Sequence, residues 1–191
     1  MCIRDRCRRA DDKLYNLIQF NNVPNLKTSD FEETESYNND INLCFTNEKR
    51  KKINDIKMRA LNAKKHYKGG IKLKALPYDK RTQDVILNKG VPIISKVNSE
   101  DMDLVNNQRF VITKVGALQI TIEDDSGMER DIFTHEFQKY FLVAYATTIH
   151  SSQGMSIGKN YTIHEWDKLD EKLKYVALSR ARNHELIHIM K

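Results

Sequence analysis

A loop crowded with hydroxyl and amide side chains follows a short apolar run in the second half of the chain. It reads Ala144-Tyr-Ala-Thr-Thr-Ile-His-Ser-Ser-Gln-Gly154. Such groups at a strand-to-helix junction, helped by free backbone N–H groups, donate hydrogen bonds to phosphate oxygens. Ser and Thr are also common helix caps, so a capped helix with a polar first turn explains the same residues.

A second stretch places two arginines at the C-terminal end of a predicted amphipathic helix. It reads Tyr175-Val-Ala-Leu-Ser-Arg-Ala-Arg182. Arginines at this end suit the helix dipole without any further function. A fixed guanidinium can also stabilise the charge of a phosphoryl group during its transfer, which is the role called an arginine finger.

Composition narrows the classes of protein that can carry this chemistry. The 191 residues include 32 Lys and Arg against 26 Asp and Glu, a formal charge of +6 that suggests a polyanionic partner. The seven glycines form neither GxxxxGK(S/T) nor GxGxxG, which argues against a complete P-loop or Rossmann enzyme. The three cysteines lack a CxxC pair, and no apolar run approaches the roughly 20 residues of a membrane helix. We expect a soluble, intracellular protein without a metal site or a membrane partner.

The first part of the chain predicts a helix, a linker and a β-α unit. Residues 8–26 fit a short helix that Pro24 ends, and the acidic residues 28–40 fit a linker. Residues 41–45 fit a buried strand, followed by a helix from residue 48 to just before Gly69. Its apolar face carries Ile53, Ile56, Ala60 and Leu61. Residues 1–6 lack the apolar core of a signal peptide, and we expect this start to be non-native.

The spacing of apolar residues changes twice in the remainder of the chain. Residues 71–140 alternate with a period of two, with strands predicted at 91–97, 109–115, 119–123 and 128–133. This spacing favours a small antiparallel barrel. Strands are then predicted at 141–146, 161–164 and 186–190, with a helix at 168–182. The predicted architecture is an α/β lobe, residues 41–70 plus 141–191, interrupted by a β-rich insertion at 71–140.

Together these stretches resemble the C-terminal motifs of superfamily 1 DNA helicases of the UvrD/RecD-like group, closest to the Pif/RecD branch. The loop at 144–154 is similar to motif V, A-Y-A-x-T-x-H-K-S-Q-G, and residues 175–182 are similar to motif VI. The run Cys44-Phe-Thr-Asn-Glu-Lys49 resembles motif IV. The resemblance extends from residue 41 to the end of the chain. Ser151 stands where the family commonly has Lys, which removes one cationic contact to a phosphate.

The resemblance implies a RecA-like second motor lobe, a P-loop NTPase-like fold without its own P-loop, with an SH3-like inserted barrel. Residues 1–40 would then be the end of the first lobe and a linker. ATP and Mg²⁺ would be bound mainly by that first lobe, joined in cis. Arg180 aligns with the arginine finger, and Gln153, Gly154 and Arg182 with positions that couple to ATP or support the lobe interface. The positions aligned with DNA binding are Thr46, Asn47, Lys49, Arg50, Thr148, His150, Ser151 and Ser152.

The implied function is the C-terminal part of an ATP-dependent DNA helicase of replication or repair. It would translocate on single-stranded DNA, unwind duplex junctions and be inactive without its first lobe. Residues 41–75 agree, because they carry eleven Lys or Arg residues against two acids. Two alternatives stay open: a non-catalytic single-stranded nucleic-acid-binding module, and an RNA-directed superfamily 1 helicase. His135 and His164 have no metal-ligand spacing, and Trp166 suits core packing better than base stacking.

Overall fold

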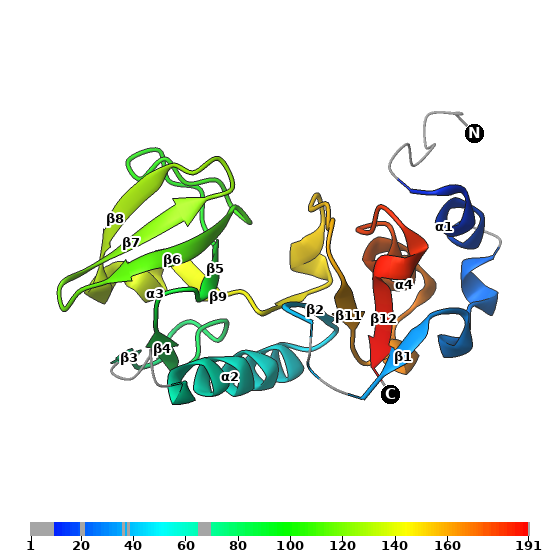
Figure 1. The fold of residues 1–191 in the computed structure, drawn as a ribbon, viewed down its shortest axis with the longest axis horizontal. Coiled ribbons are helices and arrows are strands. Elements are labelled where there is room, and N and C mark those ends of the chain that lie inside the picture. Colours follow the sequence, from blue (N-terminus) through cyan, green and yellow to red (C-terminus); the bar gives the residue numbers. More distant parts are fainter. Residues whose placement is uncertain (1–9, 20–21, 36, 38, 65–69, 191) are drawn as a thin grey trace. The chain divides into compact units, whose positions relative to one another are not determined.

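The structure is a computed structural model that describes residues 10–19, 22–35, 37, 39–64 and 70–190 (Figure 1). Residues 1–6, the predicted helix start at residue 8 and the predicted helix end before Gly69 lie outside the described residues. The chain forms two compact units. Unit 1 comprises residues 1–50 and 147–191, and unit 2 comprises residues 51–146.

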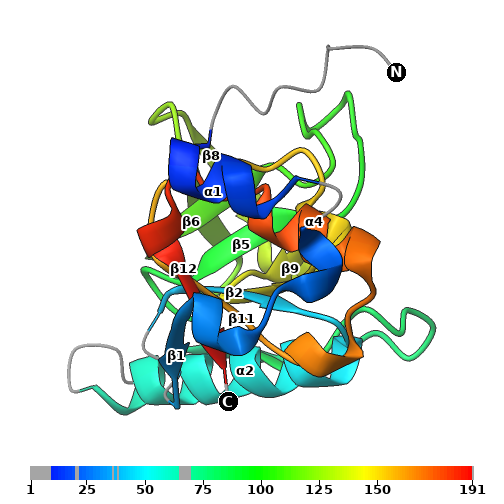
Figure 2. The same ribbon diagram turned by 90° about the vertical axis from the view of Figure 1, so that its right-hand side faces the viewer.

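Unit 1 is built on a five-stranded sheet with the order β1-β12-β11-β2-β10 (Figure 2). The strands are β1 (Glu32–Thr34), β2 (Ile41–Cys44), β10 (Ala146–Thr148), β11 (Tyr161–Ile163) and β12 (Ile187–Met190). β1 pairs with β12, β12 with β11, and β11 with β2, all in parallel. The predicted α/β class is therefore confirmed, and these strand pairings are parallel.

Short helices complete unit 1 around an apolar core. They are α1 (Asp12–Leu17), η2 (Val23–Asn25), η3 (Thr28–Asp30), η6 (His150–Ser152), η7 (Trp166–Lys168), α4 (Glu171–Leu178) and η8 (His184–Leu186). The core includes the fully buried Leu14, Leu43, Ile163, Leu178 and Ile189. Nearly continuous burial along β2, β11 and β12 is expected for strands of a parallel sheet, which are covered on both faces.

The prediction for residues 8–40 was wrong in two respects. The helix α1 ends at Leu17, and Pro24 lies in the first turn of η2, where its missing N–H costs no hydrogen bond. Residues 32–34 are not a linker but the edge strand β1. Its acidic, half-exposed side chains concealed it, because an edge strand can be polar on its open side.

The helix α2 (Asn47–Ala63) follows β2 as predicted, but its buried face differs from the expected one. Ile53, Asn54 and Met58 are buried, whereas Ile56 is 36% exposed and Ala60 is exposed. The apolar pattern failed because one buried position holds Asn54. Asn54 is buried because its side chain forms hydrogen bonds with backbone groups of Val143 and Ala146.

Unit 2 contains an antiparallel sheet with the order β8-β7-β6-β5-β9. Its strands are β5 (Pro92–Ser95), β6 (Arg109–Val115), β7 (Gln119–Asp124), β8 (Glu129–Phe133) and β9 (Phe141–Val143), and β3 (Ile71–Leu73) pairs with β4 (Val85–Leu87) separately. The short helices η5 (Thr134–Glu136) and α3 (Phe137–Tyr140) precede β9. Alternating burial, as in Ile120 and Ile122, places one face in a core that holds Phe110, Phe137 and Phe141. The four strands predicted between residues 91 and 133 are confirmed, and barrel closure stays a prediction.

The single strand predicted at 141–146 was wrong, because the structure divides it between the two sheets. β9 pairs with β5 in the antiparallel sheet, and β10 lies beside β2 in the parallel one. The Asn54 side chain bonds the backbone at this division. Its Nδ2 donates to Val143 O at 3.0 Å and Ala146 O at 3.2 Å, and its Oδ1 accepts from Ala146 N at 2.8 Å. A buried amide thereby bonds backbone groups at the point where β9 ends and β10 begins.

The boundaries between the two compact units lie at residues 50/51 and 146/147. The sequence analysis placed the boundaries of the insertion at 70/71 and 140/141. β9 accordingly packs with the insertion rather than with the parallel sheet. Among the described residues, no helix is both long enough and apolar enough to cross a bilayer.

Candidate functional site

Residues 147–155, named here the motif V turn, form a tight turn rather than the start of an α-helix. β10 ends at Thr148 and is followed by the three-residue 3-10 turn η6. The Thr148 hydroxyl accepts from Ser151 N at 3.2 Å and lies 2.9 Å from Ser151 Oγ. Thr148 is therefore a cap, as one interpretation expected, but the expected α-helix is absent from this described segment.

The motif V turn presents some of its polar side chains to solvent and uses others internally. His150, Ser151 and Gln153 are exposed. Ser152 is fully buried, and its hydroxyl donates to Ile149 O at 2.7 Å. Gly154 has φ of +85°, a left-handed conformation that favours glycine. The exposed side chains can reach a ligand, whereas Ser152 and Gly154 set the shape of the turn.

Arg180 connects the motif V turn to the second candidate stretch. Its Nη1 donates to Met155 O at 3.1 Å and to Ser152 O at 3.3 Å. Its Nε donates to Val176 O at 3.0 Å, and its Nη2 donates to Ser179 Oγ at 3.0 Å. The two motifs that the sequence separates by more than twenty residues are therefore joined by one guanidinium.

The predicted helix at 168–182 is shorter in the structure, and this change positions both arginines. The Asp170 side chain caps α4 by accepting from Leu173 N at 2.7 Å, and the helix ends at Leu178. Arg180 therefore lies beyond the helix, where its backbone carbonyl accepts from Ile157 N at 2.8 Å. Arg182 is exposed, and its carbonyl accepts from Asp11 N at 2.9 Å. Arg182 belongs to a junction with α1, not to the Arg180 contacts.

The N-terminus of α2 faces a carboxylate that the sequence analysis did not anticipate. Thr46 donates to Glu165 from its backbone N at 3.0 Å and from its hydroxyl at 3.0 Å. The same hydroxyl accepts from Lys49 N at 3.2 Å. Thr46 thus caps α2, while Glu165 takes the position at the positive end of the helix that an anion favours.

Glu165 is held in its ionised form despite its limited exposure. Burial by itself would raise the pKa of this carboxyl. Hydrogen bonds from the Thr46 backbone, the Lys168 ammonium and the Thr46 hydroxyl outweigh burial, and the pKa of Glu165 is lowered. Glu165 also has φ of +59°, an uncommon conformation for a residue other than glycine. A strained backbone and a charged side chain thus coincide next to α2.

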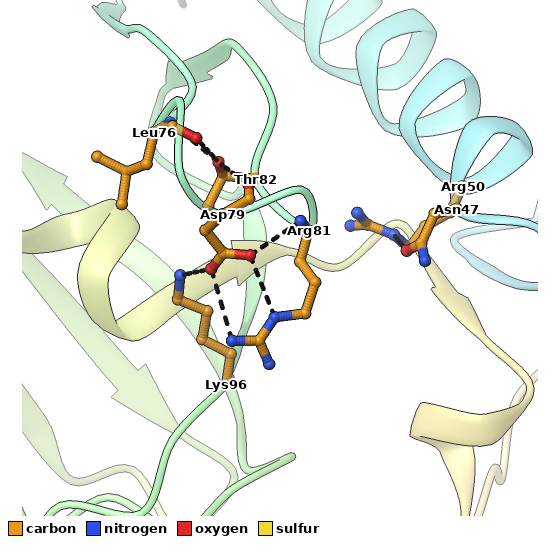
Figure 3. Close-up of polar contacts among 7 residues, drawn as sticks. All are labelled: Asn47, Arg50, Leu76, Asp79, Arg81, Thr82 and Lys96. Atoms are coloured by element: carbon orange, nitrogen blue, oxygen red, sulfur yellow. Dashed lines mark hydrogen bonds and ion pairs between the residues drawn. The ribbon is translucent and has the colours of Figure 1, made fainter.

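The other residues of the motif IV resemblance differ sharply in exposure. Asn47 is exposed, whereas Arg50 is 4% exposed and donates from Nε to Asn47 Oδ1 at 3.1 Å (Figure 3). This bond orients the Asn47 side chain by its amide oxygen. The amide NH₂ group of Asn47 is its donor for a ligand. Lys49 lies over the Tyr37 ring, with Nζ 5.6 Å from the ring centroid. Asn47 is therefore exposed, Lys49 is half-buried and Arg50 is buried.

A buried histidine lies beneath Tyr37 in unit 1. The rings of Tyr37 and His164 stack with centroids 5.8 Å apart, and His164 Nε2 lies 2.9 Å from Asn42 Oδ1. Burial, the main cause, and the charge of Lys49 lower the pKa of His164 to about 4. Asn42 Nδ2 donates to Asn39 O, so Oδ1 accepts and the neutral imidazole carries its proton on Nε2. His164 is therefore a neutral, packed residue.

No family model matches the chain. It is 29% identical over 124 residues to the ATP-dependent DNA helicase Pif1 of Bdellovibrio bacteriovorus, covering 56% of this chain and 27% of that protein. The chain therefore spans about a quarter of the length of this curated relative.

Solved structures of similar fold cover almost the whole chain. Pif1 from Bacteroides in complex with ADP-AlF3 and single-stranded DNA has a TM-score of 0.68 at 22% identity, covering 95% of this chain and 49% of that one. A structure of two coordinating Pif1 helicases at forked double-stranded DNA has a TM-score of 0.67 at 23% identity, with 95% and 47% covered. Pif1 from Candida albicans has a TM-score of 0.62 at 15% identity, with 94% and 52% covered. The chain is therefore similar in sequence to a Pif1 helicase over 124 residues, and its fold is similar to that of about half of each solved Pif1 chain.

The contacts that sequence reasoning missed come from residues outside the motifs. Tyr37 lies only seven residues before the motif IV resemblance, whereas Glu165 is distant in sequence, and parallel pairing of β11 with β2 brings the segment after β11 next to Thr46. A sequence signal existed for Glu165 only in its position directly after a buried strand. Trp166 is buried as expected, 5.6 Å from the Phe31 ring. Among the described residues, no group of three or more His, Cys, Asp or Glu side chains can hold a metal ion.

Proposed function

We propose that this chain is the second, RecA-like motor lobe of an ATP-dependent DNA helicase that translocates on single-stranded DNA and unwinds duplex. Its first lobe, joined in cis, would hold most of the ATP and the Mg²⁺. Support comes from the sequence match to a protein named as an ATP-dependent DNA helicase. The similar Pif1 chains were solved with ADP-AlF3, single-stranded DNA and forked duplex.

The observation that carries the proposal is the bonding of Arg180 to the motif V turn. One guanidinium nitrogen donates to two carbonyl oxygens of that turn, Ser152 O and Met155 O. In the proposed role as arginine finger, Arg180 also interacts with the γ-phosphate of ATP. A phosphate oxygen competes with neutral carbonyl oxygens for the same donors and forms the stronger, charge-assisted bond. Binding and loss of the γ-phosphate would thus change the restraint on the motif V turn.

The chain's own groups suit a nucleotide phosphate. A half-buried guanidinium and the exposed amide of Gln153 are donors, and Gly154 allows the turn its left-handed conformation. We assign Gln153 and Gly154 to coupling between this nucleotide contact and DNA. Arg182, which joins the junction with α1, is assigned to the interface with the first lobe.

Three exposed polar side chains and the half-buried Lys49 form our proposed contribution to the DNA groove. Asn47, Lys49, His150 and Ser151 would contact the DNA backbone. The other four residues of the predicted set hold them in place: Thr46 caps α2, Arg50 orients Asn47, Thr148 caps η6, and Ser152 fixes the turn. Ser151 in the position of a lysine predicts a shallower dependence of affinity on salt.

We also propose the finer fold assignments. The RecA-like lobe consists of the two segments that flank the insertion and form the parallel sheet, and the strands β5 to β9 (residues 92–143) form an SH3-like barrel. Five antiparallel strands of three to seven residues around one apolar core support the barrel. Residues 1–40 would include the end of the first lobe.

The test is the single-stranded-DNA-stimulated ATPase of the full-length protein that contains this chain. Arg180→Ala should lower turnover by about 10³-fold, the contribution of an arginine finger. Arg182→Ala is the matched control and should change turnover only a few-fold. Near-normal turnover in Arg180→Ala would exclude the finger role.

The same assay separates the alternative functions. Full-length protein that binds single-stranded DNA without hydrolysing ATP would be a non-catalytic binding module. Greater stimulation of the ATPase by single-stranded RNA than by DNA would indicate an RNA-directed helicase.

A further inference from the structure

A rigid turn, residues 76–82, connects β3 to β4 in unit 2. Asp79 N donates to Leu76 O at 3.1 Å, and Thr82 N donates to Asp79 O at 3.0 Å. The Thr82 hydroxyl closes the turn by accepting from Leu76 N at 2.9 Å and donating to Asp79 O at 2.8 Å (Figure 3). This bonding fixes the backbone on both sides of the residues at the tip of the turn.

An ion pair ties this turn to the rest of unit 2. The Asp79 carboxylate accepts from the Lys96 ammonium, and the Lys96 side chain is only 4% exposed (Figure 3). Arg81 donates to the same carboxylate from its backbone N at 2.9 Å and from Nε at 3.3 Å. Lys96 N donates to Tyr140 O at 2.8 Å, so Lys96 links the turn to the end of α3. The turn and residues 139–140 are therefore held together before any ligand binds.

The turn and residues 139–140 present one aromatic ring to solvent, with cationic side chains beside it. Tyr78 is 81% exposed, and Lys80 and Arg81 on the same turn are exposed. Lys139 is exposed, with Nζ 4.7 Å from the Tyr140 ring centroid. Its pKa is raised, first by a hydrogen bond to Tyr140 and to a smaller extent by Glu136 and Tyr78. We name Tyr78, Lys80, Arg81, Lys139 and Tyr140 the Tyr78 patch.

Packing does not account for Tyr78. A tyrosine that stabilises a fold usually buries its ring, and this ring remains in water on a turn that other residues already hold. The acid nearest in sequence, Asp79, is already paired with Lys96 and Arg81, so its charge is compensated. An exposed ring with cations beside it matches the chemistry of single-stranded nucleic acid, in which flat bases alternate with phosphates.

We propose that the Tyr78 patch is a contact site for single-stranded DNA, where the Tyr78 ring stacks on a base. Lys80, Arg81 and Lys139 bind the phosphates on either side. The site deepens the proposed function, on which it rests, by adding a base-stacking contact outside the three helicase motifs. Rigidity of the turn favours binding, because the backbone that carries the ring is fixed before the strand arrives and less conformational entropy is lost.

The experiment measures binding of a fluorescent oligothymidylate, and of an abasic strand of the same length, to the 191-residue chain by fluorescence anisotropy. Tyr78→Ala should weaken oligothymidylate binding by about 5- to 100-fold, the effect of losing one stacked base. It should leave abasic-strand binding unchanged, and Tyr78→Phe should bind like the parent chain. Phe133→Ala is the matched control, because Phe133 is a 50% exposed aromatic in the same unit.

The possible outcomes separate this site from the motif-based groove. If Tyr78→Ala binds oligothymidylate within twofold of the parent chain, the inference is overturned, and the ATPase test of Arg180 is unaffected. Equal weakening by Tyr78→Ala on the abasic strand also overturns base stacking. If Lys49→Ala leaves affinity unchanged while Tyr78→Ala lowers it, the patch is supported and the groove beside α2 is not. A chain that binds neither strand overturns the patch.

Discussion

The Nη1 atom of Arg180 lies 3.1 Å from the carbonyl oxygen of Met155. This bond, with the one to Ser152 O, restrains the motif V turn from outside, because Arg180 follows a different helix. Short-range bonds, such as those from Ser151 N to Thr148 Oγ and from Ser152 Oγ to Ile149 O, hold the 3-10 segment, and the Arg180 guanidinium adds a restraint at the end of the turn. Anything that draws the guanidinium away must therefore loosen the turn.

Hydrogen exchange should report this restraint directly. In Arg180→Ala, the amides of Ser152, Met155 and Ile157 should exchange faster, because their acceptors all belong to the turn or to Arg180 itself. The free energy of unfolding should fall by about 1–3 kcal/mol, since two turn carbonyls lose their donor. Arg182→Ala is the control and should leave these three amides unchanged. Unchanged exchange in Arg180→Ala would show that the turn holds itself.

Glu165 should oppose the binding of DNA phosphates at the N-terminus of α2. Replacement of this carboxylate in Glu165→Gln keeps an acceptor for Thr46 but removes the negative charge, so affinity for single-stranded DNA should rise by about two- to fivefold. The gain should shrink as salt increases. Glu185→Gln, an exposed change of equal charge in the same unit, is the control. Equal effects of the two variants would mean that only net charge matters.

Much of the fold follows from local pattern, and the departures have identifiable causes. The strands at 109–115 and 119–124 were predicted almost to the residue, because alternation is strict and each is flanked by turn residues. The polar edge strand β1 and the division between β9 and β10 were missed. Both depend on partners distant in sequence: β12 for the first, and the buried Asn54 for the second.

For the candidate site too, some features could be predicted from the sequence and others could not. The motif resemblance predicted functional roles for Arg180 and for residues of the motif V turn. In the structure, the Arg180 guanidinium forms a hydrogen bond with this turn. Which side chains are exposed could not be predicted, because Arg50 and Ser152 look as available in sequence as Lys49 and Ser151. The carboxylate of Glu165 was missed because the parallel arrangement of β2 and β11 decides its position.

His164 should make the stability of unit 1 depend on pH. Its pKa is about 4 in the folded chain, below the ordinary 6.5, so the unfolded chain binds the proton more readily. The stabilisation is complete above pH 6.5 and is lost as pH falls toward 4, by up to about 3 kcal/mol. Urea unfolding of His164→Gln should show a smaller decrease between pH 7 and 4.5 than the parent chain. Equal decreases would show that His164 does not cause the pH dependence.

The buried ion pair of Asp79 and Lys96 should matter far more to unit 2 than a similar pair on its surface. Burial alone would raise the pKa of Asp79, but hydrogen bonds from Lys96 and Arg81 outweigh it and lower the pKa to about 2. Because this value lies below 3.8, the stabilisation is present above pH 4 and is lost as pH falls toward 2. Asp79→Asn should cost about 3 kcal/mol at pH 7, since it leaves the Lys96 ammonium buried without its partner.

The matched control for that cost is Asp84→Asn, which breaks the pair between Asp84 and Lys74. The Lys74 side chain is 90% exposed and the Asp84 side chain is 61% exposed. It should cost no more than about 1 kcal/mol, because water solvates both charges once they separate. Adding Lys96→Met to Asp79→Asn should recover much of the lost stability, since no unpaired charge then stays buried. Thermal and urea unfolding of the four chains measure these differences. Equal costs for Asp79→Asn and Asp84→Asn would show that Lys96 reaches water in solution and that the turn carrying Tyr78 is not held by this pair.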